Sequence, residues 1–368
     1  MDVEKVFIIM SKDKILKKIN QAILKGFFPG AVLLVGLDNK IVLHEAYGKA
    51  DIFNDTKMQK DSLFDLASLT KPFATALAIS KLVGDKKIFL DQKVGTILKY
   101  FSQNTKKDIT IDMLLRHTSG LPAHRKYYKK IIKRKNPRQY LRFLLAKEPL
   151  VNKPNECQVY SDLGFMVLCW IIEFVTNKRL DHFVHEQIYS ILDIDDLFFI
   201  DIQRKEKVST LKRNKIVAFS QCPWRGKIML GEVDDDNAWA AGGIEGHAGL
   251  FGDTTSVFVL CCEILNALNN KDVKGIYPDI IKLMVQKKNN FEMVAGFDTP
   301  SKEKSSCGDF FSSSSIGHLG FTGTSFWIDP KTSLIVIFFT NRVHPSRLNE
   351  GIKEFRGKLH DLIFKLVF

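Results

Sequence analysis

The chain has 368 residues, and its 54 lysine and arginine residues against 41 aspartate and glutamate residues give a net charge of +13. Hydrophobic residues make up 45% of it, which is ample for the core of one large domain or of two interlocked ones. The strongest apolar run, residues 163–172, has about half the length needed to cross a bilayer, so we expect no transmembrane helix.

The N-terminal ten residues lack the pattern of a signal peptide. Acidic residues flank Lys5, the apolar segment covers only residues 6–10, and no small-residue cleavage site follows. The six cysteines form no Cys-x-x-Cys pair and have no ligand spacing with histidine, which favours buried free thiols over a zinc site. We therefore expect an unexported, cytoplasmic protein; a wrongly assigned start codon would leave the periplasm or the envelope open.

The predicted elements begin with an amphipathic helix that starts at Ser11 and ends before Gly26. Two apolar runs, residues 31–35 and 40–44, follow with a turn of Gly-Leu-Asp-Asn between them, which predicts a β-hairpin. The next helix lies around Ser68. From about residue 90 to residue 240 the pattern is mainly helices and long loops, including a helix over residues 162–176.

Strands return near the C-terminus, over residues 316–322, 324–328 and 333–340, and an apolar stripe at helical spacing predicts a final helix that covers a sheet. Strands and a helix at each terminus around a helical middle indicate a single α/β (α+β) unit over residues 1–368. We expect a discontinuous α/β domain made of about 1–90 and 241–368, with a mainly helical insertion at about 91–240.

Ser68-Leu69-Thr70-Lys71 is the segment with the clearest chemistry. A serine three residues before a lysine on a helix places both side chains on one face. A lysine in its neutral amine form can there take the proton of the serine hydroxyl. A helix N-terminus also favours developing negative charge, so Ser68 is a candidate acylating nucleophile. The alternative is a simple helix start, with Ser68 as the N-cap and Pro72 in the first turn.

Two further segments complete a set. Tyr160-Ser161-Asp162 opens an apolar helix, and His318-Leu319-Gly320 opens a strand-like stretch. In this order the three segments resemble the serine β-lactamase and penicillin-binding-protein superfamily, and most closely its class C-type branch of esterases and D-amino-acid peptidases. Residues 114–122, LLRHTSGLP, are similar to a signature of that branch, and residues 222–226, 242–251 and 341–345 are similar to a bacterial subgroup.

The resemblance implies a central antiparallel sheet flanked by helices, with the active site at the junction with the helical insertion. It also implies roles for single residues. Ser68 is the expected nucleophile, Lys71 the source of positive field and a candidate base, and Tyr160 the second candidate base. Which of Lys71 and Tyr160 takes the first proton stays open.

The cleft residues after these three depart in part from true β-lactamases. His318 replaces a lysine and can bind Tyr160 or a substrate carboxylate, with less charge at neutral pH. The expected oxyanion hole is made of the Ser68 and Phe321 amides, with Gly320 letting a substrate backbone approach. Asp162 replaces an asparagine and accepts hydrogen bonds where the amide donates; it could pair with Lys71.

The other polar residues carry weaker signals. Arg342 and His344 follow a core strand and are possible cleft residues, with a structural role as the alternative. His117 and His247 lie in turn-rich signatures and are expected to brace loops. The aspartates at 234–236 could bind a cation but are expected to form a solvated loop, so we predict no metal and no cofactor.

The basic segment at residues 125–135 is expected to be a solvated surface rather than a nucleic-acid site, because no nucleic-acid-binding motif accompanies it. The sequence thus predicts a serine hydrolase that cleaves an ester or amide bond in a small or peptide-like acyl substrate. Two alternatives remain: a β-lactamase or DD-carboxypeptidase acting on cell-wall material such as peptidoglycan fragments, and a non-catalytic binder of muropeptides.

Overall fold

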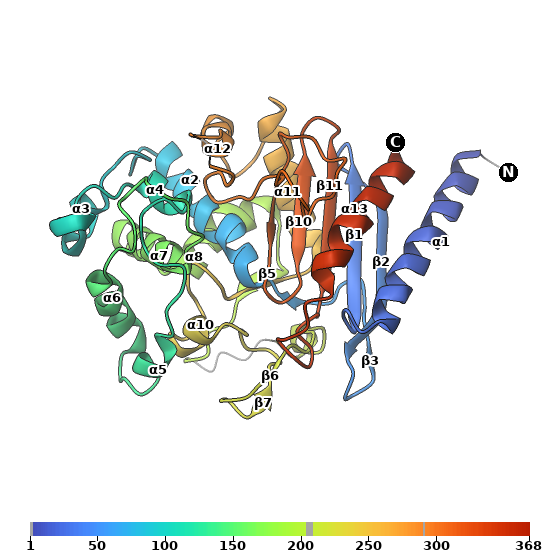
Figure 1. Ribbon diagram of the computed structural model, residues 1–368, viewed down its shortest axis with the longest axis horizontal. Coiled ribbons are helices and arrows are strands. Elements are labelled where there is room, and N and C mark those ends of the chain that lie inside the picture. Colours follow the sequence, from blue (N-terminus) through green and yellow to red (C-terminus); the bar gives the residue numbers. More distant parts are fainter. Residues whose placement is uncertain (1–2, 204–208, 290) are drawn as a thin grey trace.

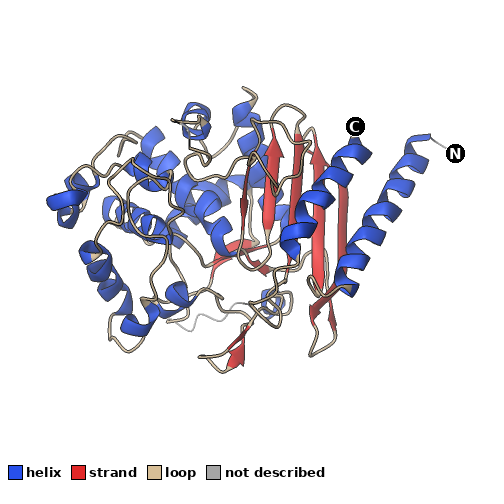
Figure 2. Cartoon of the chain, viewed as in Figure 1, coloured by secondary structure: helices blue, strands red, loops and turns tan. Residues whose placement is uncertain are grey.

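A six-stranded antiparallel sheet forms one side of the computed structural model, which describes residues 3–203, 209–289 and 291–368 (Figures 1 and 2). Its strand order is β3-β2-β1-β11-β10-β9, so strands from the two ends of the chain meet where β1 pairs with β11. The strands are β1 (Gly30–Leu37), β2 (Lys40–Asp51), β3 (Thr56–Lys57), β9 (Ile316–Leu319), β10 (Ser325–Asp329) and β11 (Leu334–Thr340).

The two central strands, β1 and β11, are apolar at nearly every position because both faces of the sheet are covered. In β1, Leu33 packs with the helices at the two ends of the chain, whereas Val32 and Leu34 face the larger core on the other side. Successive side chains of a strand point to opposite faces, so a strand buried on both sides reads as a continuous apolar run. The expected antiparallel α/β fold is confirmed.

Two long helices, α1 (Val3–Leu24) and α13 (Ile352–Val367), lie side by side on one face of the sheet (Figure 1). On the opposite face, α11 (Thr254–Leu268) packs against β1, β10 and β11. This second face belongs to the larger core, which continues into the helical part of the molecule.

The helical part lies on the other side of this core, and its α-helices are mostly short (Figure 2). They are α2 (Leu77–Gly84), α3 (Val94–Ile97), α4 (Ile111–Leu115), α5 (Tyr128–Ile131), α6 (Pro137–Lys147), α7 (Asp162–Thr176), α8 (Leu180–Val184), α9 (Thr210–Arg213), α10 (Asp236–Ala240) and α12 (Pro278–Val285). Short 3₁₀ or π segments are η1 (Ala67–Leu69), η2 (Lys71–Ala76), η3 (Lys99–Phe101), η4 (Asn104–Lys106), η5 (His185–Tyr189) and η6 (Ser190–Leu192).

Small sheets connect these parts. One is three-stranded, with the order β4 (Phe64–Asp65), β8 (Leu250–Gly252) and β5 (Leu197–Phe199), and β4 leads directly into η1. The other pairs β6 (Gln221–Cys222) with β7 (Lys227–Ile228). Within the described ranges, no helix is both long enough and apolar enough to cross a membrane.

Two predicted boundaries are wrong. The first helix begins at Val3 instead of Ser11, because residues 3–10 contain neither glycine nor proline to stop it and the capping preference of one serine is too weak to break it. Strand β9 ends at Leu319 instead of Thr322. The chain turns there, as the Gly320 amide donates to the Thr324 carbonyl and Gly323 has a φ of 110°.

The predicted hairpin and α7 are confirmed. Asp38 and Asn39 form the tight turn between β1 and β2, and both have positive φ, as a two-residue hairpin turn requires. Helix α7 begins at Asp162 because the Ser161 side chain accepts a hydrogen bond from the Gly164 amide. This cap fixes Tyr160 and Asp162 at the N-terminus of the helix.

Candidate active site

Ser68 lies in a tight turn where the chain leaves β4 and begins η1. Ala67, the residue before it, has a φ of 48°, a backbone conformation that a side chain disfavours. Strain of this kind persists only where the surroundings impose it, and it is frequent at functional sites. Ser68 caps neither η1 nor η2, whose N-cap residues are Leu66 and Thr70, so the expected N-cap role is wrong, whereas Pro72 does lie in the first turn of η2.

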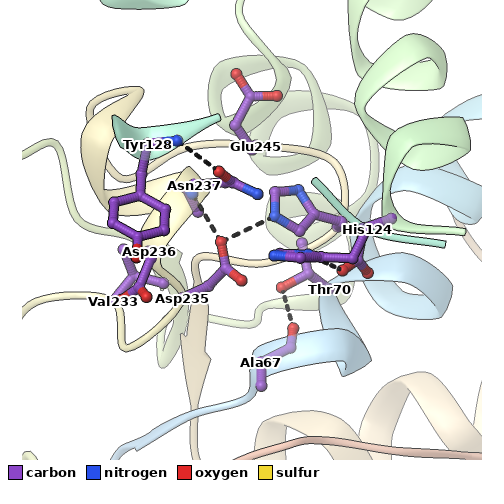
Figure 3. Close-up of polar contacts among 12 residues, drawn as sticks. Ala67, Thr70, His124, Tyr128, Val233, Asp235, Asp236, Asn237 and Glu245 are labelled. Carbon is purple, nitrogen blue, oxygen red and sulfur yellow. Dashed lines mark hydrogen bonds and ion pairs between the residues drawn. The ribbon is translucent and has the colours of Figure 1, made fainter. Parts of the chain in front are cut away.

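Hydrogen bonds of four side chains hold this turn in place. The Asp65 carboxylate accepts from the Ala67 amide at 2.9 Å. The Thr70 hydroxyl donates to the Ala67 carbonyl at 2.6 Å (Figure 3). From the β9–β10 side, the hydroxyls of Thr322 and Thr324 donate to the carbonyls of Asp65 and Leu66. The turn is therefore fixed to both the small sheet and the large one.

Lys71 is completely buried one turn after Ser68. Its ammonium lies 3.0 Å from Ser68 Oγ and 2.8 Å from Asp162 Oδ1, and it also donates to the His247 carbonyl at 3.3 Å. Burial by itself would lower the pKa of Lys71, but Asp162 and Tyr160 outweigh it and raise the pKa to about 12. Lys71 is therefore an ammonium in the resting protein, and the lowered pKa that a ready lysine base needs is absent.

Tyr160 and Asp162 reach Ser68 and Lys71 from the start of α7. The Lys71 ammonium lies 4.7 Å from the centre of the Tyr160 ring. Removal from water raises the pKa of the Tyr160 phenol, although Lys71 acts in the opposite direction. Burial would also raise the pKa of Asp162, but the Lys71 ammonium and His124 hold it well below its usual range. The resting pair is thus a neutral phenol beside an ammonium.

Two histidines contact Tyr160. His318, on β9, is 5% exposed, and its ring centre lies 5.9 Å from that of Tyr160. Burial, then Lys71, lowers the pKa of His318 to about 3, so its ring is neutral. The His117 ring is tilted against the Tyr160 ring, with 4.6 Å between their centres, and it accepts a hydrogen bond from the Ser161 amide at 2.9 Å, which is the bracing role expected from the sequence.

Gly320 and Phe321 close the cleft beside Ser68. A Cβ on Gly320 would lie 2.0 Å from Thr324 Oγ1 and 2.7 Å from the Leu66 carbonyl, so glycine is needed for packing against the Ser68 turn. The close approach of a substrate backbone to Gly320 stays a prediction. Among the described residues, neither the Ser68 nor the Phe321 amide donates to another part of the chain. The expected oxyanion hole needs two amides without a protein partner, and its role stays a prediction.

Two hollows open on either side of Ser68, and both are also lined by Tyr160 and Phe321. The first, of about 370 Å³, is called here the acidic half; its other main lining residues are His124, Asp162, Asp234, Asp235, Asp236, His247 and Arg347. The second, of about 360 Å³, is the basic half; its other main lining residues are Met293, Asp298, His318, Leu319, Gly320, Arg342, Ile352, Lys353 and Arg356.

The three aspartates of the acidic half are paired, not solvated, so that expectation is wrong. Asp234 and Asp236 contact Arg347, both at 3.0 Å. Asp235 lies 3.0 Å from His247 Nε2 and accepts from the Ala238 amide, and nearby the Tyr128 amide donates to Asn237 (Figure 3). Within the described ranges, no group of three or more histidine, cysteine or acidic residues could hold a metal ion.

The basic half contains a guanidinium with almost no partners. Arg356, on α13, is 4% exposed; its one hydrogen bond runs from Nη2 to the Gly323 carbonyl at 3.4 Å, and no partner of its Nε is found among the described residues. Burial, then Arg342, lowers the pKa of Arg356 to about 9. Arg342 lies over the Phe321 ring at 4.7 Å. A buried cation without an acidic partner is a strong site for an anion.

The structure thus brings together Ser68, Lys71, Tyr160, Asp162, His318, Gly320, Phe321 and Arg342. His344 is not among the residues that line either half of the cleft. Its ring bonds the Phe219 carbonyl at 2.8 Å and the Ile52 amide at 3.2 Å, so it bridges two loops. Of the two roles that the sequence left open for His344, these contacts support the structural one.

Sequence reasoning missed His124, Asp298, Arg347 and Arg356. One signal was available for Arg356, because it falls on the apolar stripe of the last helix between Ile352 and Leu359, where a charged residue is unusual. His124 follows the LLRHTSGLP segment by two residues, but nothing in its surroundings predicts contact with Asp162 at 3.3 Å. Asp298 has no sequence signal.

Comparison with known proteins gives one family over most of the chain. The family model named Beta-lactamase matches residues 14–358. A putative D-alanyl-D-alanine carboxypeptidase of Escherichia coli (strain K12) is 28% identical over 359 residues, covering 86% of this chain and 79% of that protein. A protein of the same name from Salmonella typhimurium is 29% identical over 354 residues, covering 88% and 81%.

Solved structures show the same fold at lower identity. EstCE1, a hydrolase with promiscuous acyltransferase activity, has a TM-score of 0.73 at 19% identity, over 96% of this chain and 99% of that one. The octameric penicillin-binding protein homologue from Pyrococcus abyssi has a TM-score of 0.72 at 18% identity, over 100% and 78%.

Proposed function

Because the chain belongs to the β-lactamase family and is a serine hydrolase, we propose that it releases the C-terminal residue of a peptide-like substrate through an acyl-enzyme on Ser68. The leaving residue is taken to be a D-amino acid, in line with the carboxypeptidase name of the relatives. Fragments of cell-wall peptide are the corresponding substrate class.

The buried guanidinium of Arg356 carries this proposal. It lines the half of the cleft that Ser68 shares with His318 and Phe321, and it has no acidic partner among the described residues. A carboxylate bound there would supply the missing charge-assisted hydrogen bonds. A C-terminal residue brings such a carboxylate close to its own amide bond, whereas a simple ester need not. This favours a carboxypeptidase over a carboxylesterase.

The proposed reaction needs one proton to move twice. Ser68 Oγ forms a bond to the scissile carbonyl carbon, the carbon–nitrogen bond breaks, and the leaving amine receives a proton; water then cleaves the ester. The Lys71–Tyr160 pair relays the proton. At rest this pair holds one proton too many to act as a base, since both pKa values are raised, so it must first lose that proton.

The remaining roles follow from position. The Ser68 and Phe321 amides would hold the oxyanion, as both are without partners in the described chain. His318 is neutral and donates from Nδ1 to the Leu319 carbonyl at 2.9 Å, which leaves Nε2 as an acceptor for Tyr160 or the leaving amine. A non-catalytic binder would not need an ammonium in contact with a serine hydroxyl.

We also place the protein in the cytoplasm. All six cysteines are free thiols, as is usual in a reducing compartment. Peptide fragments that reach such a compartment would then be the substrate, and intact cell wall would not. Fractionation of cells that express the chain with its own start would test this location; export to the envelope would contradict it.

The first experiment measures covalent labelling by intact mass with a fluorophosphonate and with a penicillin. The wild-type protein should gain the fluorophosphonate mass and Ser68→Ala should not, with turnover falling about 10³-fold or more in that variant. Retained turnover in Ser68→Ala would overturn the assignment of the nucleophile.

The second experiment compares an acyl-D-alanyl-D-alanine peptide with its C-terminal amide. The free acid should be the better substrate, and Arg356→Gln should reduce kcat/KM for it by about tenfold to a hundredfold while the amide and fluorophosphonate labelling change little. Equal turnover of acid and amide by the wild-type protein would exclude the carboxypeptidase proposal and favour an esterase.

A further inference from the structure

Asp298 is a carboxylate without a cationic partner in the same half of the cleft as Arg356. It lies on a segment that pairs with β9, where its amide donates to the Gly317 carbonyl at 2.8 Å, one residue before His318. Its own carboxylate accepts from the Thr299 amide at 2.9 Å, and no ion pair of Asp298 occurs among the described residues. Burial raises the pKa of Asp298 to about 6.

An unpaired carboxylate and an unpaired guanidinium therefore line one hollow that opens at Ser68. Both charges lose hydration there, and neither compensates the other, because no ion pair or hydrogen bond joins them among the described residues. A ligand with a carboxylate and a separate hydrogen-bond donor or ammonium would satisfy both groups. Met293 and Leu319 add apolar surface to the same lining, suited to contact with a methylene stem.

We propose that Asp298 selects a leaving residue with an amine at the end of its side chain, so that the preferred C-terminal residue is a diamino acid such as lysine or ornithine. The proposal rests on the proposed function, because it assumes that Arg356 binds the α-carboxylate of the leaving residue. Asp298 then binds the side-chain ammonium of that same residue. A terminal alanine reaches Arg356 but leaves Asp298 without a partner.

The other charged groups of this half do not supply that partner. Lys353 pairs with Glu350 at 2.7 Å, and the Arg342 guanidinium donates to the carbonyls of Arg347 and Asn349. His318 is neutral. Asp298 is thus the negative group in the lining of the basic half, and it lies next to the strand that carries His318.

The test uses peptides that are identical except for a C-terminal D-lysine, D-norleucine or D-alanine. D-Norleucine keeps most of the methylene stem of lysine without its charge. The wild-type protein should have a kcat/KM about tenfold to a hundredfold higher for D-lysine than for D-norleucine, the usual effect of a hydrogen bond between charged groups. Asp298→Asn should bring the two substrates within about threefold of each other.

Asparagine can still accept a hydrogen bond from the Thr299 amide, so the Asp298→Asn variant should keep its fold, which its melting temperature reports. Asp253→Asn is the matched control, since Asp253 is another buried carboxylate with a raised pKa but caps α11 outside the cleft. This control should leave the preference for D-lysine unchanged.

The outcomes separate the two proposals. If D-alanine or D-norleucine is released as fast as D-lysine, and Asp298→Asn changes nothing, the role of Asp298 is overturned while the carboxypeptidase proposal stands. If no C-terminal residue is released although Ser68 is labelled, the proposed function fails, and the inference fails with it. A preference for D-lysine that survives Asp298→Asn would assign the selection to another residue and also overturn the proposal.

Discussion

Replacement of Asp162 by asparagine should shift the pH dependence of Ser68 reactivity toward lower pH. Asp162 Oδ1 lies 2.8 Å from the Lys71 ammonium, and the Lys71 side chain is fully buried. At this separation and an effective dielectric constant of about 20, the attraction is about 6 kcal/mol before desolvation is subtracted. Loss of the charge therefore removes the largest influence that raises the pKa of Lys71.

The size of the shift follows from the same contact. An opposite charge at contact distance usually changes a pKa by about 1 to 3 units, so the Lys71–Tyr160 pair should lose its extra proton about 1 to 3 pH units lower in Asp162→Asn. The neutral amide also leaves the Lys71 ammonium without its partner, which should destabilise the fold by about 3–5 kcal/mol at neutral pH and by less at high pH.

The assay is the rate of fluorophosphonate labelling measured from pH 6 to pH 11, which requires no knowledge of the substrate. The wild-type rate should still be rising at pH 11, because the pKa of Lys71 is raised to about 12, whereas the rate of Asp162→Asn should level off within this range. The shape of the profile is compared, because the absolute rate also depends on how well Lys71 is held. Asp112→Asn is the matched control: it removes an ion pair of the same 2.8 Å length, to Arg116, outside the cleft. An Asp162→Asn rate that still rises up to pH 11, as in the wild-type protein, would refute the claim that Asp162 keeps Lys71 protonated.

Three other outcomes are expected. Nitrocefin should be hydrolysed slowly, because the Asp162 carboxylate can only accept hydrogen bonds where many β-lactamases have an asparagine amide that donates one, and because His318 is neutral. Rapid hydrolysis of nitrocefin would contradict this. Gly320→Ala should abolish labelling and lower the melting temperature, since the new Cβ would lie 2.0 Å from Thr324 Oγ1, whereas Gly164→Ala has room, with its nearest atom at 3.5 Å, and should be tolerated. The pKa of buried His360 is lowered to about 3, so its contribution to the free energy of unfolding is complete above the unfolded-state pKa of about 6.5 and is lost as the pH falls. Between pH 7 and pH 5, urea unfolding should show that His360→Gln loses about 2 kcal/mol less of this free energy than the wild-type protein does. Equal losses in the two proteins would exclude the effect.

Local physical chemistry made several elements readable from the sequence. The hairpin, α7 and the last helix follow from apolar periodicity and from turn or cap residues that act over a few positions. The contact of Ser68 with Lys71 is equally local, since three residues along one helical turn bring the two side chains together. The proposed domain limits near residues 90 and 240 stay a prediction.

The protonation states and the charges of the cleft were decided by the tertiary structure. Lys71 is an ammonium because it is buried in contact with Asp162, which lies ninety-one residues further along the chain. No local sequence pattern predicts a contact between residues so far apart. Arg356, Asp298 and Ser68 come from α13, from the segment beside β9 and from the β4–η1 turn, and they line one hollow only after these parts pack together. A sequence specifies which groups can be charged; burial and partners, which depend on the whole fold, determine which of them are.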